Sequence, residues 1–144
     1  MNTDDLKKLT YQEHTFKTYD KVRYCDTDKQ GHVNNSVFNQ FFETGRVEFL
    51  YIPTSPMFDE GCSFVIASSK VDYIEEIKWP GIVEIGTSII HIGKSSIHIY
   101  QSLYQEGKLV GTSDNITVQV DNETKRSKPL SEQARKKLQS YLLE

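Results

Sequence analysis

The feature that most constrains the fold is a run of four long segments with β-type composition in the second half of the chain. These segments are Ser63 to Ile74, Ile82 to Ile92, Ser96 to Tyr104 and Leu109 to Val120. They are rich in β-branched and aromatic residues, and turns that each contain a glycine separate them. Apolar residues alternate along them, as in Val83, Ile85 and Ile89, which share one side of a strand. Connections this short join antiparallel neighbours, so the pattern predicts an antiparallel sheet.

One strongly apolar helix is predicted before these strands, from about Ser36 to Tyr51. Its apolar positions recur every three or four residues and therefore share one face. These positions are Phe38, Phe41, Phe42, Gly45 and Phe49. Asn34 and Asn35 are natural N-cap residues, and Pro53 ends the helix. Because glycine is unfavourable inside a helix, Gly45 on the apolar face indicates a close approach to a sheet.

A further strand from Thr15 to Tyr24 and a helix from about Ser131 complete the predicted elements. One apolar helix buried against a five-stranded antiparallel sheet is an α+β architecture, and we expect a single domain over residues 1–144. Long strands leave sheet edges and one sheet face to be covered. A second copy of the chain that extends the sheet would do this, so we expect a homodimer or homotetramer.

Composition and charge restrict the class of protein. The 144 residues include 17 basic and 20 acidic side chains spread along the chain, with a net charge of −3. Because the chain has no basic block, nucleic acid is not expected as a partner. No apolar run reaches the length of a signal peptide or membrane helix, so we expect no membrane association and a cytoplasmic location. Cys25 and Cys62 lack metal-ligand spacing and are expected to be reduced, partly buried thiols.

The densest polar cluster spans residues 26–35 and lies directly before the apolar helix. It contains two carboxylates, Asp26 and Asp28, followed by Gly31, His32 and two asparagines. The free N–H groups at a helix start can polarise a carbonyl and hold a developing oxyanion. A neighbouring carboxylate can attack that carbonyl or activate water for attack. The segment therefore offers the minimum equipment for acyl transfer to water.

Two simpler interpretations apply to the same cluster. Acidic and Asn/Gly-rich turns before helices most often serve only as caps, and composition alone favours that reading. The spacing of Asp26, Asp28 and Gly31 also resembles a calcium-binding loop. However, the position that would carry the bidentate glutamate is occupied by Val37, which argues against calcium.

The order and spacing of several motifs are similar to those of one enzyme family. The segment Arg23-Tyr24-x-Asp26-x-Asp28-x-x-Gly31-His32-Val33-Asn34-Asn35 is followed by Phe38 and by Glu43-x-x-Arg46-x-Glu48. Later landmarks are the 73–80 segment, Gly93-Lys94-Ser95-Ser96, Glu106-Gly107-Lys108 and Val118-x-Val120-Asp121. Over roughly residues 15–130, this pattern closely resembles the 4-hydroxybenzoyl-CoA thioesterase family of hotdog proteins.

The resemblance implies a hotdog fold, in which the five-stranded sheet wraps around the long central helix, and a C-terminal helix is added here. It also implies specific roles. The family's catalytic aspartate corresponds to Asp28, and the amide that polarises the thioester carbonyl falls at Asn35. Gly31, His32, Val33 and Asn34 would bind the substrate. Lys94 and Ser95 are candidates for contacts with the pantetheine or phosphate part of CoA. The family's active site lies at a dimer interface.

Other polar residues have competing interpretations. His32 can bond the substrate or Asp28, or it can simply order the loop. Glu43 is a second candidate for the catalytic acid, because some related hotdog enzymes place their carboxylate on the central helix. Asp114 shares a strand face with apolar residues, which marks a pocket or the wet side of the sheet. His91 and His98 lie in strands without an evident partner. Cys25, near the cluster, has no evident base to make it a nucleophile.

The sequence thus predicts an acyl-CoA thioesterase, with acyl carrier protein thioesters as possible substrates and no metal or other cofactor. Asp28 would act as nucleophile or as general base, and the sequence does not separate these roles. A non-catalytic module that binds or senses acyl-CoA is the alternative, because a fold does not determine a function. A dehydratase-type hotdog enzyme is a third option, disfavoured because it needs a histidine beside the carboxylate.

Overall fold

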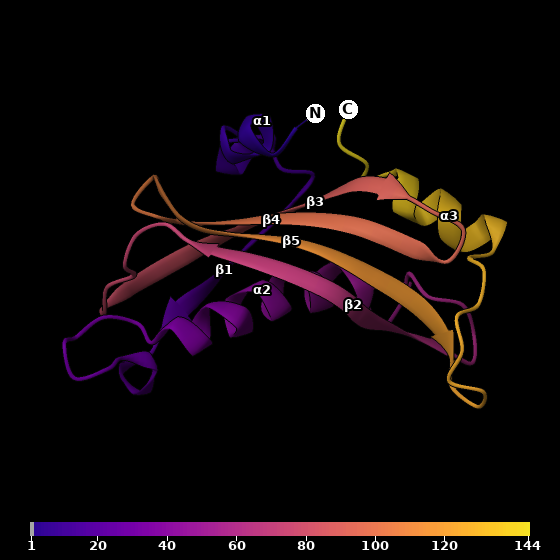
Figure 1. Ribbon diagram of the computed structural model, residues 1–144, viewed down its shortest axis with the longest axis horizontal. Coiled ribbons are helices and arrows are strands. Elements are labelled where there is room, and N and C mark those ends of the chain that lie inside the picture. Colours follow the sequence, from indigo (N-terminus) through magenta and orange to yellow (C-terminus); the bar gives the residue numbers. More distant parts are fainter. Residues whose placement is uncertain (1) are drawn as a thin grey trace.

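The computed structural model describes residues 2–144, so Met1, which the single-domain prediction includes, lies outside the described residues (Figure 1). Its five strands form one antiparallel sheet in the order β1-β3-β4-β5-β2. The strands are β1 (Phe16–Val22), β2 (Cys62–Tyr73), β3 (Gly81–Ile92), β4 (Ser96–Gln105) and β5 (Lys108–Asp121). The helices are α1 (Thr3–Lys7), α2 (Asn35–Leu50) and α3 (Glu132–Gln139). All five predicted strands and both predicted helices are confirmed.

The sheet curves over α2, which lies along its concave side (Figure 1). The apolar face of the helix supplies Phe38, Phe41 and Phe42 to a buried cluster with Val83, Ile85 and other sheet residues. Phe49 and Leu50, near the helix end, join a second cluster that also includes residues of α3. This is the predicted hotdog arrangement of a sheet around one central helix. No helix formed by residues 2–144 is both long and apolar enough to span a membrane.

Gly45 brings the α2 backbone into close contact with the sheet. A Cβ atom at this position would lie 2.7 Å from both Gln101 Nε2 and Ile85 Cγ2. The close approach also lets Gln101 Nε2 donate a hydrogen bond to the Phe42 carbonyl at 2.9 Å. The predicted close approach of the helix at Gly45 is therefore confirmed.

The sequence analysis did not predict α1 or the short 3-10 helices at Tyr11–Glu13 and Tyr24–Asp26. The five-residue α1 is too short to show a hydrophobic period. Its start is capped by the Asn2 side chain, which accepts a hydrogen bond from the Asp5 amide, and Leu6 is its buried anchor. Such a short helix is stabilised by its cap and by tertiary packing rather than by propensity.

His14 anchors the N-terminal segment on the convex face of the sheet. Its ring nitrogens bond the Ser88 and Ser102 hydroxyls, each at 2.9 Å. The ring occupies space that a side chain at Gly86 would fill, since a Cβ there would clash with it. Burial, and secondarily the charge of Lys17, lower the pKa of His14 to about 4, although Glu13 acts in the opposite direction. His14 is therefore neutral in the native state at neutral pH.

This buried histidine predicts a loss of stability in mild acid. The unfolded chain takes up a proton at His14 below its ordinary pKa of 6.5, whereas the folded chain resists protonation until about pH 4. The free energy of unfolding should therefore fall by about 2 kcal/mol between pH 7.5 and pH 5. Urea denaturation at both pH values measures this change. His14→Gln should flatten it and the exposed-site control His91→Gln should not; an equal pH response in both variants would contradict the assignment.

Candidate active site

The loop between β1 and α2 is held by the buried carboxylate of Asp26. This carboxylate accepts hydrogen bonds from the Arg23 backbone amide at 2.8 Å and from Arg23 Nη2 at 2.9 Å. The Asp26 carbonyl accepts a hydrogen bond from the Asn34 amide at 2.9 Å. Asp26 is therefore structural, because it bonds the amides of its own loop. Asp26 thus fixes the end of β1 against the start of α2.

Asp28 is exposed and lies at the start of a tight turn. Its Oδ1 atom accepts hydrogen bonds from the amides of Gln30 at 2.8 Å and His32 at 3.3 Å. Its own amide donates to the His32 carbonyl at 2.8 Å, and Gly31 adopts a φ of +80° that closes the turn. These bonds orient the carboxyl group. Within residues 2–144, Oδ2 accepts no hydrogen bond, so it is available to water or to a ligand.

The first residue of α2 presents a free amide. Asn34 is the predicted N-cap: its Oδ1 accepts from the Ser36 amide at 3.0 Å, and its carbonyl accepts from the Val37 amide at 2.9 Å. Among the hydrogen bonds of the described chain, none involves the Asn35 amide as donor. An unpaired N–H at the positive end of a helix dipole suits a developing negative charge.

Asp28 and Asn35 line the same surface pocket, which has a volume of about 350 Å³. His32 and Val33 from the loop and Phe38 from α2 also line it. Residues 73–76, at the end of β2 and just after it, also line the pocket and form its other wall. The structure therefore brings together four of the predicted site residues. Gly31 and Asn34 do not line the pocket, but they shape its loop as turn and cap.

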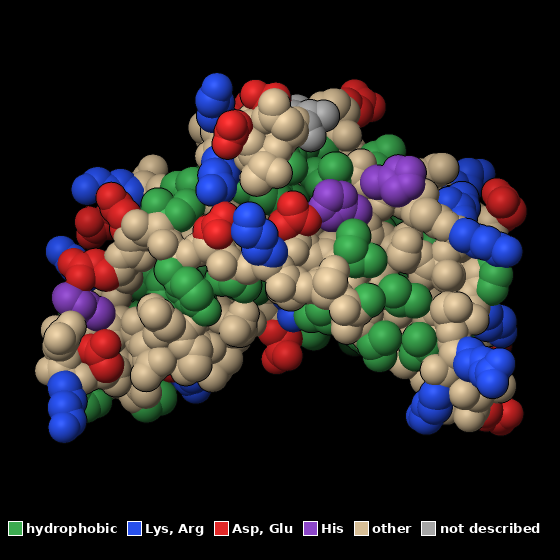
Figure 2. Space-filling view, in the orientation of Figure 1, with side chains coloured by type: hydrophobic (Ala, Val, Ile, Leu, Met, Phe, Trp, Pro, Cys, Tyr) green, Lys and Arg blue, Asp and Glu red, His purple; other side chains and the backbone are tan. Residues whose placement is uncertain are grey.

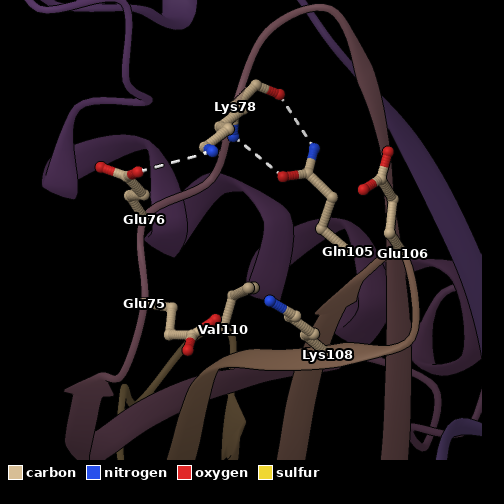
Figure 3. A pocket seen from close by; sticks show the side chains of 7 residues that line it. All are labelled: Glu75, Glu76, Lys78, Gln105, Glu106, Lys108 and Val110. Atoms are coloured by element: carbon tan, nitrogen blue, oxygen red, sulfur yellow. Dashed lines mark hydrogen bonds and ion pairs between the residues drawn. The ribbon is translucent and has the colours of Figure 1, made fainter.

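No function was predicted for the acidic segment on the opposite wall. His32 Nε2 lies 2.9 Å from a Glu76 carboxylate oxygen, and the Val33 amide donates to the Ile77 carbonyl at 2.9 Å. Figure 3 shows Glu76 directed toward Lys78 at the mouth of a neighbouring pocket of about 490 Å³. Of the alternatives for His32, the structure favours the ordering role, because the ring pairs with Glu76. Only its backbone amide contacts the Asp28 side chain.

Lys94 and Ser95 lie far from this pocket within one chain. They form the turn after β3, whereas the Asp28 loop lies near the other end of that strand, where Val22 pairs with Gly81 (Figure 1). Their backbone carbonyls accept bonds from Leu130 and Gln119, which fixes the turn beside the segment leading to α3. Lys and Arg side chains gather at this end of the molecule (Figure 2). A contact of Lys94 with the ligand of this pocket stays a prediction and requires a second copy.

Three other candidates are clarified by the structure. Glu43 is exposed and lines a different pocket with Arg46, so it does not share the Asp28 site. The expectation that His98 has no partner was wrong, because its Nε2 lies 2.5 Å from Asp114 Oδ1. This pair explains why an acid lies on that strand face. Cys25 is exposed rather than partly buried; Cys62 is buried, and both are free thiols.

Comparison with known proteins gives a consistent result. The family model described as the thioesterase-like superfamily matches residues 22–138. A predicted thioesterase from Bacillus stearothermophilus is 29% identical, with a TM-score of 0.79 over 88% of this chain and 96% of that one. A Thermus thermophilus thioesterase, solved with coenzyme A and zinc, is 28% identical, with a TM-score of 0.79 over 90% of this chain and 96% of that one.

A DHNA-CoA thioesterase from Staphylococcus aureus is 20% identical, with a TM-score of 0.76 over 87% of this chain and 91% of that one, and supports the fold alone. Among curated proteins, none matches this chain significantly. Within residues 2–144, no cluster of three or more His, Cys, Asp or Glu side chains is arranged to hold a metal ion.

The different settings of the two aspartates predict different effects on stability. Asp26→Ala should lower the free energy of unfolding by about 1 to 3 kcal/mol, because it leaves the Arg23 amide without its buried acceptor. Asp28→Asn should change it by less than about 0.5 kcal/mol, because Asp28 is exposed and an asparagine oxygen can accept the same two amides. Urea denaturation of both variants checks this, and equal losses would contradict the assignment of the structural role to Asp26 alone.

Proposed function

Because this chain belongs to the thioesterase-like superfamily, we propose that it hydrolyses the thioester bond of an acyl-CoA or an acyl carrier protein thioester. One observation carries the proposal: the Asp28 carboxylate and the free Asn35 amide line one pocket. Acyl transfer to water needs a base or nucleophile on one side of a carbonyl and a hydrogen-bond donor for its oxygen. This pocket supplies both from one short segment of chain.

In the proposed reaction, the Asn35 amide donates to the thioester carbonyl oxygen. As a general base, Asp28 takes a proton from a water molecule, whose oxygen adds to the carbonyl carbon. The tetrahedral intermediate then expels the thiolate, which takes up a proton to give the free thiol, and the free acid remains. As a nucleophile, Asp28 would instead form a mixed anhydride with release of thiol, and water would hydrolyse that anhydride. Oδ2, which has no partner within the described chain, serves either role.

Support for CoA as the carrier comes from the Thermus thermophilus thioesterase, which was solved with coenzyme A. We extend this to the present chain as a proposal, together with the predicted contact of Lys94 and Ser95 with the pantetheine or phosphate groups. Membership in the narrower 4-hydroxybenzoyl-CoA thioesterase family also stays a proposal. It rests on the Asp28-to-Asn35 motif and on the position of that motif directly before α2.

We also propose that the functional unit is a homodimer or homotetramer. Strand β2 forms a free edge of the sheet, and its Val65 and Ile66 side chains are each 45% exposed. Exposed apolar edge strands favour pairing with another chain. A second copy would also be needed to bring a Lys94 turn near the Asp28 pocket, because the two lie at opposite ends of one sheet (Figure 1).

The catalytic role of Asp28 predicts the effect of a conservative variant. Asp28→Asn should lower kcat by about 10²- to 10⁴-fold, because the amide can neither accept the water proton nor attack the carbonyl. Thiol release from a panel of short, medium, long and aromatic acyl-CoA substrates measures this. Glu43→Gln is the control and should keep near wild-type rates. If Glu43→Gln is inactive and Asp28→Asn remains active, the catalytic acid is Glu43 on α2 and not Asp28.

Two further outcomes separate the alternatives. If the wild type binds acyl-CoA but releases no thiol from any member of the panel, the protein is a binding module rather than an enzyme. If it turns over, a single turnover in ¹⁸O-water distinguishes the roles of Asp28. Label in the enzyme carboxylate indicates nucleophilic attack by Asp28 followed by addition of water to the Asp28 carbonyl carbon. Label only in the product acid shows that water adds to the substrate carbonyl carbon, as general-base catalysis requires.

The free β2 edge predicts a solution mass of twice or four times that of the single chain, measured by light scattering. Ile66→Lys, which places a charge on the exposed edge strand, should shift the protein toward the single-chain mass and lower thioester hydrolysis with it. Gln139→Lys, which adds the same charge at an exposed position on α3, is a control that should leave the mass unchanged. A single-chain mass for a fully active wild type would contradict the proposed assembly.

A further inference from the structure

The concave side of β5 carries an unusual row of buried polar residues. Ser113, Asn115 and Thr117 alternate along the strand and are at most 2% exposed. Their neighbours across the ladder in β4 are Gln101, Ile99 and Ile97. The strand that faces the helix region would be expected to carry apolar side chains here, as β4 does with its two isoleucines. The row therefore requires an explanation other than core packing.

Part of this row lacks hydrogen-bond partners. Thr117 Oγ1 donates to Asn115 Oδ1 at 2.9 Å. The other end of the same amide, Asn115 Nδ2, has no acceptor in the described chain. The Ser113 hydroxyl also has no partner among residues 2–144. Gln119, next along the same side, is by contrast fully engaged with Asp59 and two backbone carbonyls. Unpaired buried donors are costly, so each calls for a partner such as a bound water or a polar ligand.

The row begins beside the Asp28 pocket. Phe38 and Tyr73 line that pocket, and both lie next to Gly111 on β5. A Cβ at Gly111 would lie 3.0 Å from the Phe38 ring, and Tyr73 pairs with Gly111 across the ladder. Side chains on one face of a strand are separated by about 7 Å. Ser113 and then Asn115 follow Gly111 on that face, at about 7 and 13 Å from it.

The row ends at a second opening. Thr117 lines a pocket of about 150 Å³ between α2 and β2, together with Arg46 and Ile66. Helix α2 packs mainly over β1, β3 and β4, and its Phe38 also lies against Gly111 of β5. Figure 2 shows the molecule hollowed below the sheet between its two ends. The Asp28 pocket and this second pocket thus mark the two ends of the β5 row.

The polar groups along the row are mainly donors. Arg46 Nη1 donates to Gln101 Oε1 at 3.2 Å, and no acidic oxygen of residues 2–144 lies within 4.0 Å of the Arg46 guanidinium. The Arg46 guanidinium, Asn115 Nδ2 and the Ser113 hydroxyl are thus three groups able to donate to a ligand. The exposed Glu43 carboxylate is the one acid that lines the second pocket. A ligand that fits this set carries hydrogen-bond acceptors.

From this geometry we propose that Ser113 and Asn115 form an acyl-specificity subsite, which selects acyl chains bearing an oxygen function over plain hydrocarbon chains. The inference rests on the proposed thioesterase function, because the thioester at Asp28 directs the acyl group toward Gly111 and along β5. A hydroxyl, keto or carboxylate oxygen of the chain would accept the hydrogen bond from Asn115 Nδ2 or the Ser113 hydroxyl. A saturated chain would leave both donors unpaired when it enters.

Matched pairs of substrates test this subsite. We compare butanoyl-CoA with 3-hydroxybutanoyl-CoA, and octanoyl-CoA with 8-hydroxyoctanoyl-CoA. The wild type should prefer the oxygenated member of at least one pair by about 10- to 100-fold in kcat/KM, since one unpaired buried donor accounts for a difference of that size. Asn115→Leu, which replaces the amide with an apolar side chain of similar size, should remove most of that preference. Ser113→Ala should reduce the preference for 3-hydroxybutanoyl-CoA over butanoyl-CoA, because the hydroxyl of this pair lies nearer to the thioester.

The control is Thr112→Val, which removes a buried hydroxyl from the opposite face of the same strand and should leave the preference unchanged. The inference is overturned if the wild type shows no preference, or if both Asn115→Leu and Ser113→Ala retain it. It is also overturned if Asn115→Leu changes only the light-scattering mass, since the row would then contact a second copy. If Asn115→Leu does not fold, Ser113→Ala decides.

Failure of the proposed function gives a different result, namely no hydrolysis of any thioester by the wild type. In that case, calorimetric titration with thioether analogues of the same matched pairs decides the inference. Tighter binding of the oxygenated analogue, lost in Ser113→Ala, supports the subsite, and equal binding of the two analogues overturns it.

Discussion

The close packing of α2 against the sheet at Gly45 is the constraint on which the rest of the structure depends. It fixes how deep the helix lies under the curved sheet and where its N-terminus emerges. Asp26 then holds the preceding loop to that N-terminus through its buried carboxylate and its carbonyl. Because both ends of the loop are fixed, the exposed Asp28 is held in the wall of the pocket that Asn35 also lines. The candidate chemistry is thus a consequence of helix packing.

The same turn meets structural and reactive demands without conflict. One oxygen of Asp28 orders the turn by accepting two amides, whereas the other has no bond within the described chain. This segment can therefore serve both as a structural turn and as the proposed acyl-transfer site. Asp28 Oδ1 takes part in the turn, and Oδ2 is available for the chemistry. Asn34 performs the capping, so the Asn35 amide stays available. A carboxylate and a donor positioned in this way are what hydrolysis of a thioester requires.

Local patterns predicted the fold well, and long-range contacts limited the prediction of the site. Alternation located the strands, and the asparagine pair with the apolar stripe located α2 to within a residue or two. The pairings of His32 with Glu76 and of His98 with Asp114 depend on strand register and loop path, which composition does not encode. The distance of Lys94 from Asp28 within one chain depends likewise on the full length of β3.

The central proposal is that Asp28 and Asn35 act on the same carbonyl. A crystal structure with a CoA analogue in which a methylene group replaces the thioester sulfur, leaving a ketone, tests it most directly. We expect the ketone oxygen within hydrogen-bond distance of the Asn35 amide, with Asp28 Oδ2 facing the carbonyl carbon directly or through one water. A ketone bound away from both groups, with the pantetheine entering by another route, would contradict it.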